Sequence, residues 1–187
     1  MKRIKTAIVL WLIKTGEIDQ SDSELYEYAI DSMFSLLFPL ILTYCISLVM
    51  GIMLKGLLMI APFMLIRKYS GGYHLKSAGT CFVFSCVLVI TFLSAVKYGI
   101  ADKSLNLLTT IATLIIIKKS PVDSENRRLL QEEINQYKKI ARIMAGIFFL
   151  IYWILRLIKM NGYALSVGMG ILLTTVLLIP CLFQKNC

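Results

Sequence analysis

Long apolar runs separated by short polar breaks occupy the chain from residue 33 to residue 183. Most of these runs approach the roughly 20 residues that a helix needs to cross the hydrocarbon core of a bilayer. The shortest run, at residues 105–117, must recruit residues from Gly99 onward to span. The pattern therefore predicts six membrane-spanning helices, at residues 33–50, 51–66, 79–96, 105–117, 140–158 and 163–183.

The first 32 residues carry a different pattern. Apolar residues recur there at helical spacing, namely Ile4, Ala7, Ile8, Trp11 and Leu12. This spacing predicts a helix that lies on the inner leaflet, with a retained signal anchor as the alternative. The acidic residues 16–31 predict a short cytoplasmic helix that leads into the first span. We therefore expect one all-α membrane domain over residues 1–187, with cytoplasmic and interfacial helices in residues 1–32 and a transmembrane bundle in residues 33–183.

Composition and charge agree with a polytopic membrane protein. Hydrophobic residues make up 58% of the 187 residues and charged residues 17%, which is too apolar for a soluble globule of this size. In a six-span topology the basic N-terminus, the loop at 67–81 and the loop at 118–139 share one side. The positive-inside rule places that side and both termini in the cytoplasm. The net charge of +9 then indicates topology and attraction to an anionic lipid bilayer, and nucleic acid is not an expected partner.

One polar stretch carries candidate chemistry. Residues 67–81, RKYSGGYHLKSAGTC, hold the single histidine, His74, and end at Cys81. In one continuous helix these two residues would lie about 10 Å apart along the axis, too far for direct proton transfer. Gly71 and Gly72 allow the chain to leave the helix, so His74 can fold back over a following helix that carries Cys81. The N-terminus of that helix would favour a thiolate.

Each of these residues also has a structural interpretation. Cys81 could be a small apolar residue and His74 an interfacial side chain, and a basic residue such as Arg67 is often a topology anchor. Gly71 and Gly72 could form a simple turn, or their N–H groups could stabilise an oxyanion. One histidine beside one cysteine falls short of a zinc ligand set, so neither a metal nor a cofactor is expected.

The cysteines do not indicate a disulfide framework. The chain has an odd number, five, and most lie inside or at the cytoplasmic ends of the expected spans: Cys45, Cys81, Cys86, Cys181 and Cys187. Apart from Cys81, we expect them to have packing roles only.

A family resemblance favours the catalytic interpretation. The stretch RKYSGGYHLKSAGTC after two spans resembles the signature of the accessory gene regulator protein B (AgrB) family, and SPVDSENRRLLQEEINQYKKI resembles the polar segment after its fourth span. The resemblance covers essentially the whole chain. It implies a bacterial membrane cysteine endopeptidase that processes an AgrD-like propeptide in peptide quorum sensing. By this match Cys81 is the nucleophile and His74 its base, while Arg67 and Gly72 fall on positions that the family also uses.

The reaction that the resemblance implies proceeds through a thioester. Cys81 attacks a propeptide carbonyl, the C-terminal tail leaves, and a propeptide cysteine captures the acyl group as a thiolactone, which gives the autoinducing peptide. The basic loop at 118–139 is either a solvated anchor or a landing surface for an acidic peptide. The candidate substrate-binding residues in it are Lys118, Lys119, Arg127 and Arg128.

A small non-catalytic membrane transporter or assembly factor is the competing hypothesis, because it would explain six spans and basic loops equally well. Three features oppose it: no carboxylate lies centrally in any expected span, no inverted repeat is visible, and the one histidine lies close to a cysteine in the sequence. The sequence does not identify a third catalytic group. It also leaves the oligomeric state open, with a homodimer as one alternative.

Overall fold

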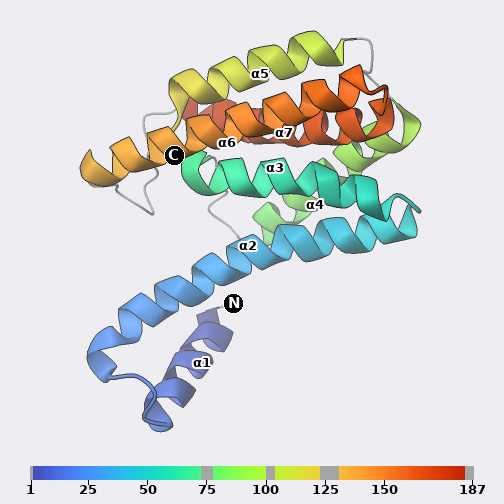
Figure 1. Cartoon of the computed structure of the whole chain (residues 1–187). Coiled ribbons are helices and arrows are strands. Elements are labelled where there is room, and N and C mark those ends of the chain that lie inside the picture. Colours follow the sequence, from blue (N-terminus) through green and yellow to red (C-terminus); the bar gives the residue numbers. More distant parts are fainter. Residues whose placement is uncertain (1, 73–77, 100–103, 123–130, 184–187) are drawn as a thin grey trace. The chain divides into compact units, whose positions relative to one another are not determined.

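The computed structural model describes residues 2–72, 78–99, 104–122 and 131–183 (Figure 1). Helices and no strands occur in these ranges, which confirms the all-α prediction for the described part of the chain. The elements are α1 (Lys2–Lys14), the short helix η1 (Gln20–Asp22), α2 (Ser23–Val49), α3 (Met53–Ser70), α4 (Ala78–Tyr98), α5 (Leu105–Lys119), α6 (Gln131–Leu157) and α7 (Asn161–Phe183).

Each of the six predicted spans coincides with one of the helices α2 to α7, although the helices α2 and α6 begin earlier than expected. The separate cytoplasmic helix predicted before the first span is instead the start of α2. Two helical segments are long and apolar enough to cross a membrane by length and composition, Ile134–Leu157 and Asn161–Cys181. Shorter apolar segments occur at Leu37–Val49 and Phe82–Tyr98. The count of six spans is therefore not confirmed and stays a prediction.

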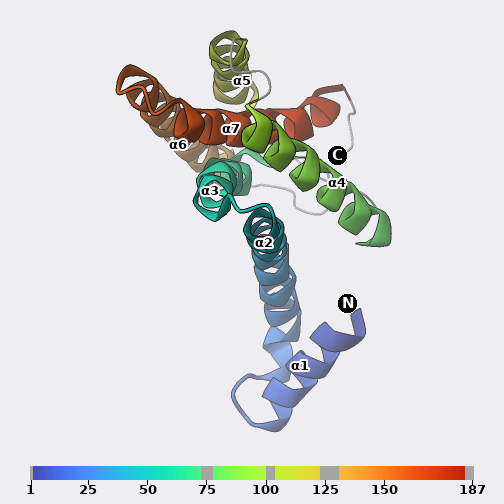
Figure 2. The ribbon, with the colours of Figure 1, turned by 90° about the vertical axis from the view of Figure 1, so that its right-hand side faces the viewer.

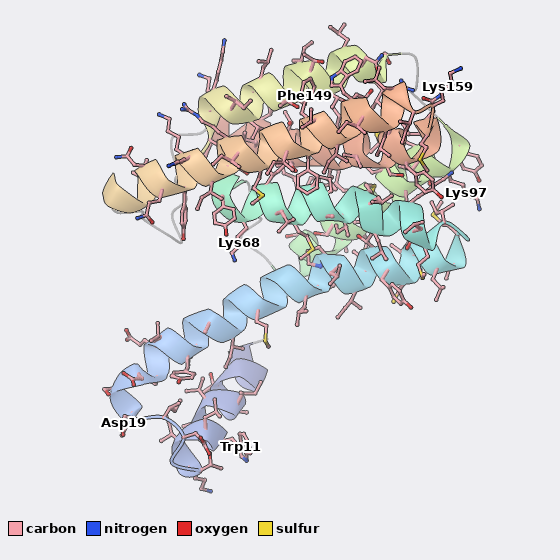
Figure 3. All side chains as sticks on the ribbon, viewed as in Figure 1. Trp11, Asp19, Lys68, Lys97, Phe149 and Lys159 are labelled. Atoms are coloured by element: carbon pink, nitrogen blue, oxygen red, sulfur yellow. The ribbon has the colours of Figure 1, made fainter. Side chains whose placement is uncertain are left out.

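The chain forms two compact units, Met1–Ile41 and Leu42–Cys187, which we call the N-terminal unit and the bundle unit. The N-terminal unit has a small core of Val9, Ile18 and Ile30, with further apolar side chains of α1 packed on it. The expected apolar stripe of α1 is divided by this packing, because Leu12 joins the core whereas Trp11 is 63% exposed (Figure 3).

Helix α7 is the centre of the bundle unit. The helices α3, α4, α5 and α6 all pack against it (Figure 2). In its most apolar window 78% of residues are buried, against 17% in the corresponding window of α6. Glycines permit the closest contacts, since a Cβ on Gly170 would lie 2.1 Å from the carbonyl oxygen of Met59 on α3. The small residues of α7 therefore let neighbouring backbones approach, as in helix packing within membranes.

Large apolar side chains cover the outside of the bundle unit. Many are well exposed on α4, α5 and α6, including Phe82, Val83 and Val87, Leu107, Ile111 and Leu114, and Ile143, Ile147, Leu150 and Ile154. Apolar surface of this extent is unusual for a soluble monomer and fits contact with lipid.

A polar cluster joins α5, α6 and α7 at one end of the bundle unit. The Tyr152 hydroxyl, which is fully buried, donates a hydrogen bond to Oδ1 of Asn106. Arg156 donates from Nε to the same oxygen at 3.1 Å, and from Nη1 to Oδ1 of Asn161 at 3.1 Å. Lys97 and Lys159 lie at this end of the bundle unit, and Lys68 lies toward the opposite end (Figure 3). We call the opposite end the motif end, because residues 67–81 begin there, in the last turn of α3.

Candidate active site at the motif end of the bundle

The two glycines of the motif end α3. The helix stops at Ser70, and Gly71 and Gly72 follow with φ of 74° and 147°, values that favour glycine. The N–H of Gly71 donates to the carbonyl oxygen of Arg67 at 3.1 Å, which closes the last turn. The next helix, α4, begins at Ala78 and places the backbone of Cys81 in its first turn. His74 lies outside the described residues, so its pairing with Cys81 stays a prediction.

The segment that follows α5 contacts this glycine turn directly. The N–H of Val122 donates to the carbonyl oxygen of Ser70 at 3.0 Å. A Cβ on Gly71 would lie only 2.6 Å from the carbonyl oxygen of Val122. A side chain at position 71 is therefore excluded both by the backbone conformation and by the neighbouring main chain. The start of the basic loop at 118–139 is thus held against the glycine turn of residues 67–81.

Arg67 faces the same turn from the last turn of α3. Its side chain is half-buried, and its Cζ atom lies 5.4 Å from the centre of the Phe63 ring. A Cβ on Gly72 would lie 3.7 Å from Cζ of Arg67 and 3.4 Å from the carbonyl oxygen of Leu177 on α7. The half-buried guanidinium group therefore stands beside the glycine turn.

Basic side chains from three helices gather at the motif end. Lys118 and Lys119 are exposed in the last turn of α5. Helix α6 is joined to α3 by an edge-to-face contact of Tyr69 and Tyr137, whose ring centres are 5.6 Å apart. Arg142 of α6 donates from Nε to the carbonyl oxygen of Ile117 at 3.0 Å. The other two candidate substrate-binding residues, Arg127 and Arg128, lie outside the described part of the chain.

One expectation about the cysteines is wrong. Cys45 and Cys86 are free thiols, as expected for packing residues. Cys181, which is buried near the end of α7, is instead disulfide-bonded. Spacing along the sequence could not reveal this bond, because a disulfide depends on where helix ends meet in space.

Comparison with known proteins identifies the family. The family model described as Accessory gene regulator B matches residues 5–178. The chain belongs to the accessory gene regulator B family. Accessory gene regulator protein B of Staphylococcus intermedius is 28% identical over 150 residues, which cover 80% of this chain and 78% of that protein. The protein of the same name from Staphylococcus aureus strain Newman is 29% identical over 148 residues, covering 79% and 76%. No solved structure matches the chain.

Membership of the AgrB family confirms the resemblance seen in the motif, and the matched range includes His74, Cys81 and the polar loop. The contacts of Ser70, Val122 and Leu177 were not foreseen. They involve main-chain carbonyl and N–H groups, which every residue carries, so no side chain in the sequence could indicate them.

Proposed function

We propose that this AgrB-family protein is a membrane-embedded cysteine endopeptidase that removes the C-terminal tail of an AgrD-like propeptide. The family match over residues 5–178 carries the proposal, since that range includes the one histidine and the candidate nucleophile. The local structure supports it in one respect. The backbone of Cys81 lies in the first turn of α4, where the helix dipole favours a thiolate.

In the proposed reaction, the Cys81 thiolate attacks a propeptide carbonyl carbon and forms a tetrahedral intermediate. The C–N bond then breaks, the departing amine takes a proton from His74, and the tail leaves as a free peptide. The remaining acyl group is a thioester of Cys81. A propeptide thiol attacks this thioester, closes a thiolactone and releases the Cys81 thiol. Because a thioester exchanges for a thioester, the cyclisation needs no ATP.

Supporting roles follow from the contacts around the glycine turn. The N–H groups of Gly71 and Gly72 are candidates to stabilise the oxyanion of the tetrahedral intermediate. The Arg67 guanidinium, which lies beside Gly72, is a candidate to fix the turn or to bind a peptide carbonyl. Enclosure of the thioester at the bilayer surface would limit its hydrolysis.

The proposed topology has six spans, with the termini and the motif end in the bacterial cytoplasm. It is supported by the apolar exterior of α4, α5 and α6 and by the basic side chains at the motif end. The helix α1, with its exposed Trp11, would lie in the lipid interface as a helix of one membrane domain. A homodimer remains an alternative to a monomer.

Mass spectrometry of the propeptide tests the proposed function. We expect vesicles that contain this protein and its propeptide to accumulate a free C-terminal tail. They should also accumulate a cyclic product, lighter by one water than the hydrolysed peptide. A non-catalytic transporter or assembly factor would leave the propeptide intact, so an uncleaved propeptide in these vesicles would refute the proposal.

The proposed landing surface gives a separate, salt-dependent prediction. Replacing Lys118, Lys119, Arg127 and Arg128 by glutamine should weaken capture of an acidic propeptide tail about fourfold or more, because each exposed ion pair contributes roughly 0.2–1 kcal/mol. The deficit should shrink as salt rises, since the Debye length is about 8 Å at physiological ionic strength. The measurement is the cleavage rate as a function of salt concentration.

A matched pair of variants controls for net charge. Lys118→Gln with Lys119→Gln removes two charges at the motif end, and Lys97→Gln with Lys159→Gln removes two at the opposite end (Figure 3). Only the first pair should slow cleavage at low salt. Equal deficits in the two pairs, or a deficit that does not change with salt, would identify the basic residues as anchors and not as a binding surface.

A further inference from the structure

We propose that the main chain of Val122 is a positioning element for the catalytic turn, an inference that rests on the proposed protease function. Val122 lies beyond α5 in the sequence, yet it contacts the turn on two sides. Its N–H donates to the carbonyl oxygen of Ser70, and its own carbonyl oxygen lies 2.6 Å from the position that a Cβ on Gly71 would occupy. We call this pair of contacts the Val122 clamp.

The residues around the Val122 clamp hold it in place. Ser70 is fully buried, and the partly buried side chain of Val122 packs on the main hydrophobic core. A carbonyl group buried at the end of α3 needs a hydrogen-bond donor, and leaving it without one costs about 1–3 kcal/mol. Val122 supplies that donor, so the glycine turn and the segment after α5 are expected to keep their positions relative to each other.

The clamp bears on catalysis because of its place in the sequence. His74 follows Gly72 by two residues in the sequence, so the proposed base is tethered closely to the turn. A shift of the turn would therefore shift the proposed base, and a misplacement of about 1 Å can cost about a hundredfold in rate. Val122 also lies three residues after Lys119. One short segment thus connects the proposed substrate surface to the catalytic turn.

Removing the N–H of Val122 tests the clamp. Val122→Pro lacks the donor, whereas Val122→Ala keeps it and loses only two methyl groups. We expect Val122→Pro to lower kcat for propeptide cleavage about threefold to tenfold below Val122→Ala, with KM unchanged, because the clamp does not touch the substrate. Alkylation of Cys81 at about pH 6.5 should slow in parallel if His74 promotes the thiolate. Equal kcat and alkylation rates in the two variants would overturn the inference.

A second change avoids the ring of proline in case Val122→Pro does not fold. The α-hydroxy acid analogue of valine, incorporated at position 122, replaces the N–H with an ester oxygen and keeps the side chain. It should lower kcat in the same way and to a similar extent. An ester variant with the wild-type kcat would contradict the clamp.

The opposite side of the contact has a control as well. Gly71 and Gly51 both have a positive φ, 74° and 71°, so alanine is strained at each position, and the ψ of −160° at Gly71 adds to the strain there. A Cβ on Gly51 meets nothing within 4 Å, whereas one on Gly71 meets the carbonyl oxygen of Val122. Gly71→Ala should therefore lower kcat and Gly51→Ala should not. Equal kcat values would show that the close approach is irrelevant to catalysis.

The outcomes separate the two levels of the proposal. If Cys81→Ala cleaves the propeptide as well as the wild type, the protease function itself fails, whatever the Val122 variants do. If Cys81→Ala is inactive while Val122→Pro and the ester variant match Val122→Ala, the protease function stands and only the clamp is refuted.

Discussion

Replacing Cys81 by alanine or by serine is expected to abolish cleavage of the propeptide while leaving membrane insertion intact. Either change removes the thiolate and leaves the apolar character of α4 almost unaltered. Loss of a catalytic nucleophile should lower the rate by at least about 10³-fold. The measurement is release of the C-terminal tail from vesicles, with protein recovered in the membrane fraction as the check on insertion.

The control for this experiment lies on the same helix. Cys86 is a half-buried free thiol five residues farther along α4, and Cys86→Ala should cleave at the wild-type rate. A reductant is included throughout, because Cys181 forms a disulfide and the reaction requires a free thiol at Cys81. Substantial tail release by Cys81→Ala would rule out the mechanism.

The second large effect concerns the fold. Gly170→Ala would place a methyl group 2.1 Å from the carbonyl oxygen of Met59 and 2.5 Å from Cγ of Pro62. Both obstacles belong to α3, so α3 and α7 must separate to accept the methyl group. We expect a loss of about 3 kcal/mol or more in the free energy of unfolding, at the upper end of overpacking effects. The measurement is thermal unfolding in detergent, followed by circular dichroism.

Gly146→Ala is the matched control. Gly146 is also a helical glycine, on α6, but a Cβ there meets nothing within 4 Å. Alanine favours a helix over glycine by up to about 1 kcal/mol, so this variant should be unchanged or slightly more stable. If Gly170→Ala unfolds at the same temperature as Gly146→Ala, the close contact of α3 and α7 is wrong.

The lengths of the apolar runs predicted the locations of the helices better than the residues at which the helices begin. The run at 79–96 became α4 (Ala78–Tyr98), since glycine and polar residues bound the apolar stretch on both sides. The start of α2 differs from the prediction. Its acidic residues were assigned to a separate helix, yet no glycine or proline interrupts residues 23–38, and acidic side chains suit a helix N-terminus. Polar and apolar turns therefore continue as one helix.

The site could be predicted only in part. The helix break at Gly71 and Gly72 follows from glycine in the sequence, and the helix that carries Cys81 follows from the apolar run. The neighbours of the turn could not be predicted, because Val122 and Leu177 contribute carbonyl oxygens from segments about 50 and 105 residues away in sequence. Such contacts depend on how helices pack and not on which side chains they carry.

Helix α4 is packed against the bundle unit mainly through its second half, so its first half can tilt about that contact. Among the side chains of α4 that the structure describes, the buried ones are Val89, Leu93 and Val96, all in the second half, while the first half of the helix diverges from α7 (Figure 2). The backbone of Cys81 lies eight residues before Val89, an overhang of about 12 Å. A rotation of about 10° about the Val89 contact would move that backbone by about 2 Å, more than enough to misalign a nucleophile. In the proposed six-span topology, bilayer thickness changes the tilt of α4, so the lipid would then alter the rate of the proposed peptide cleavage.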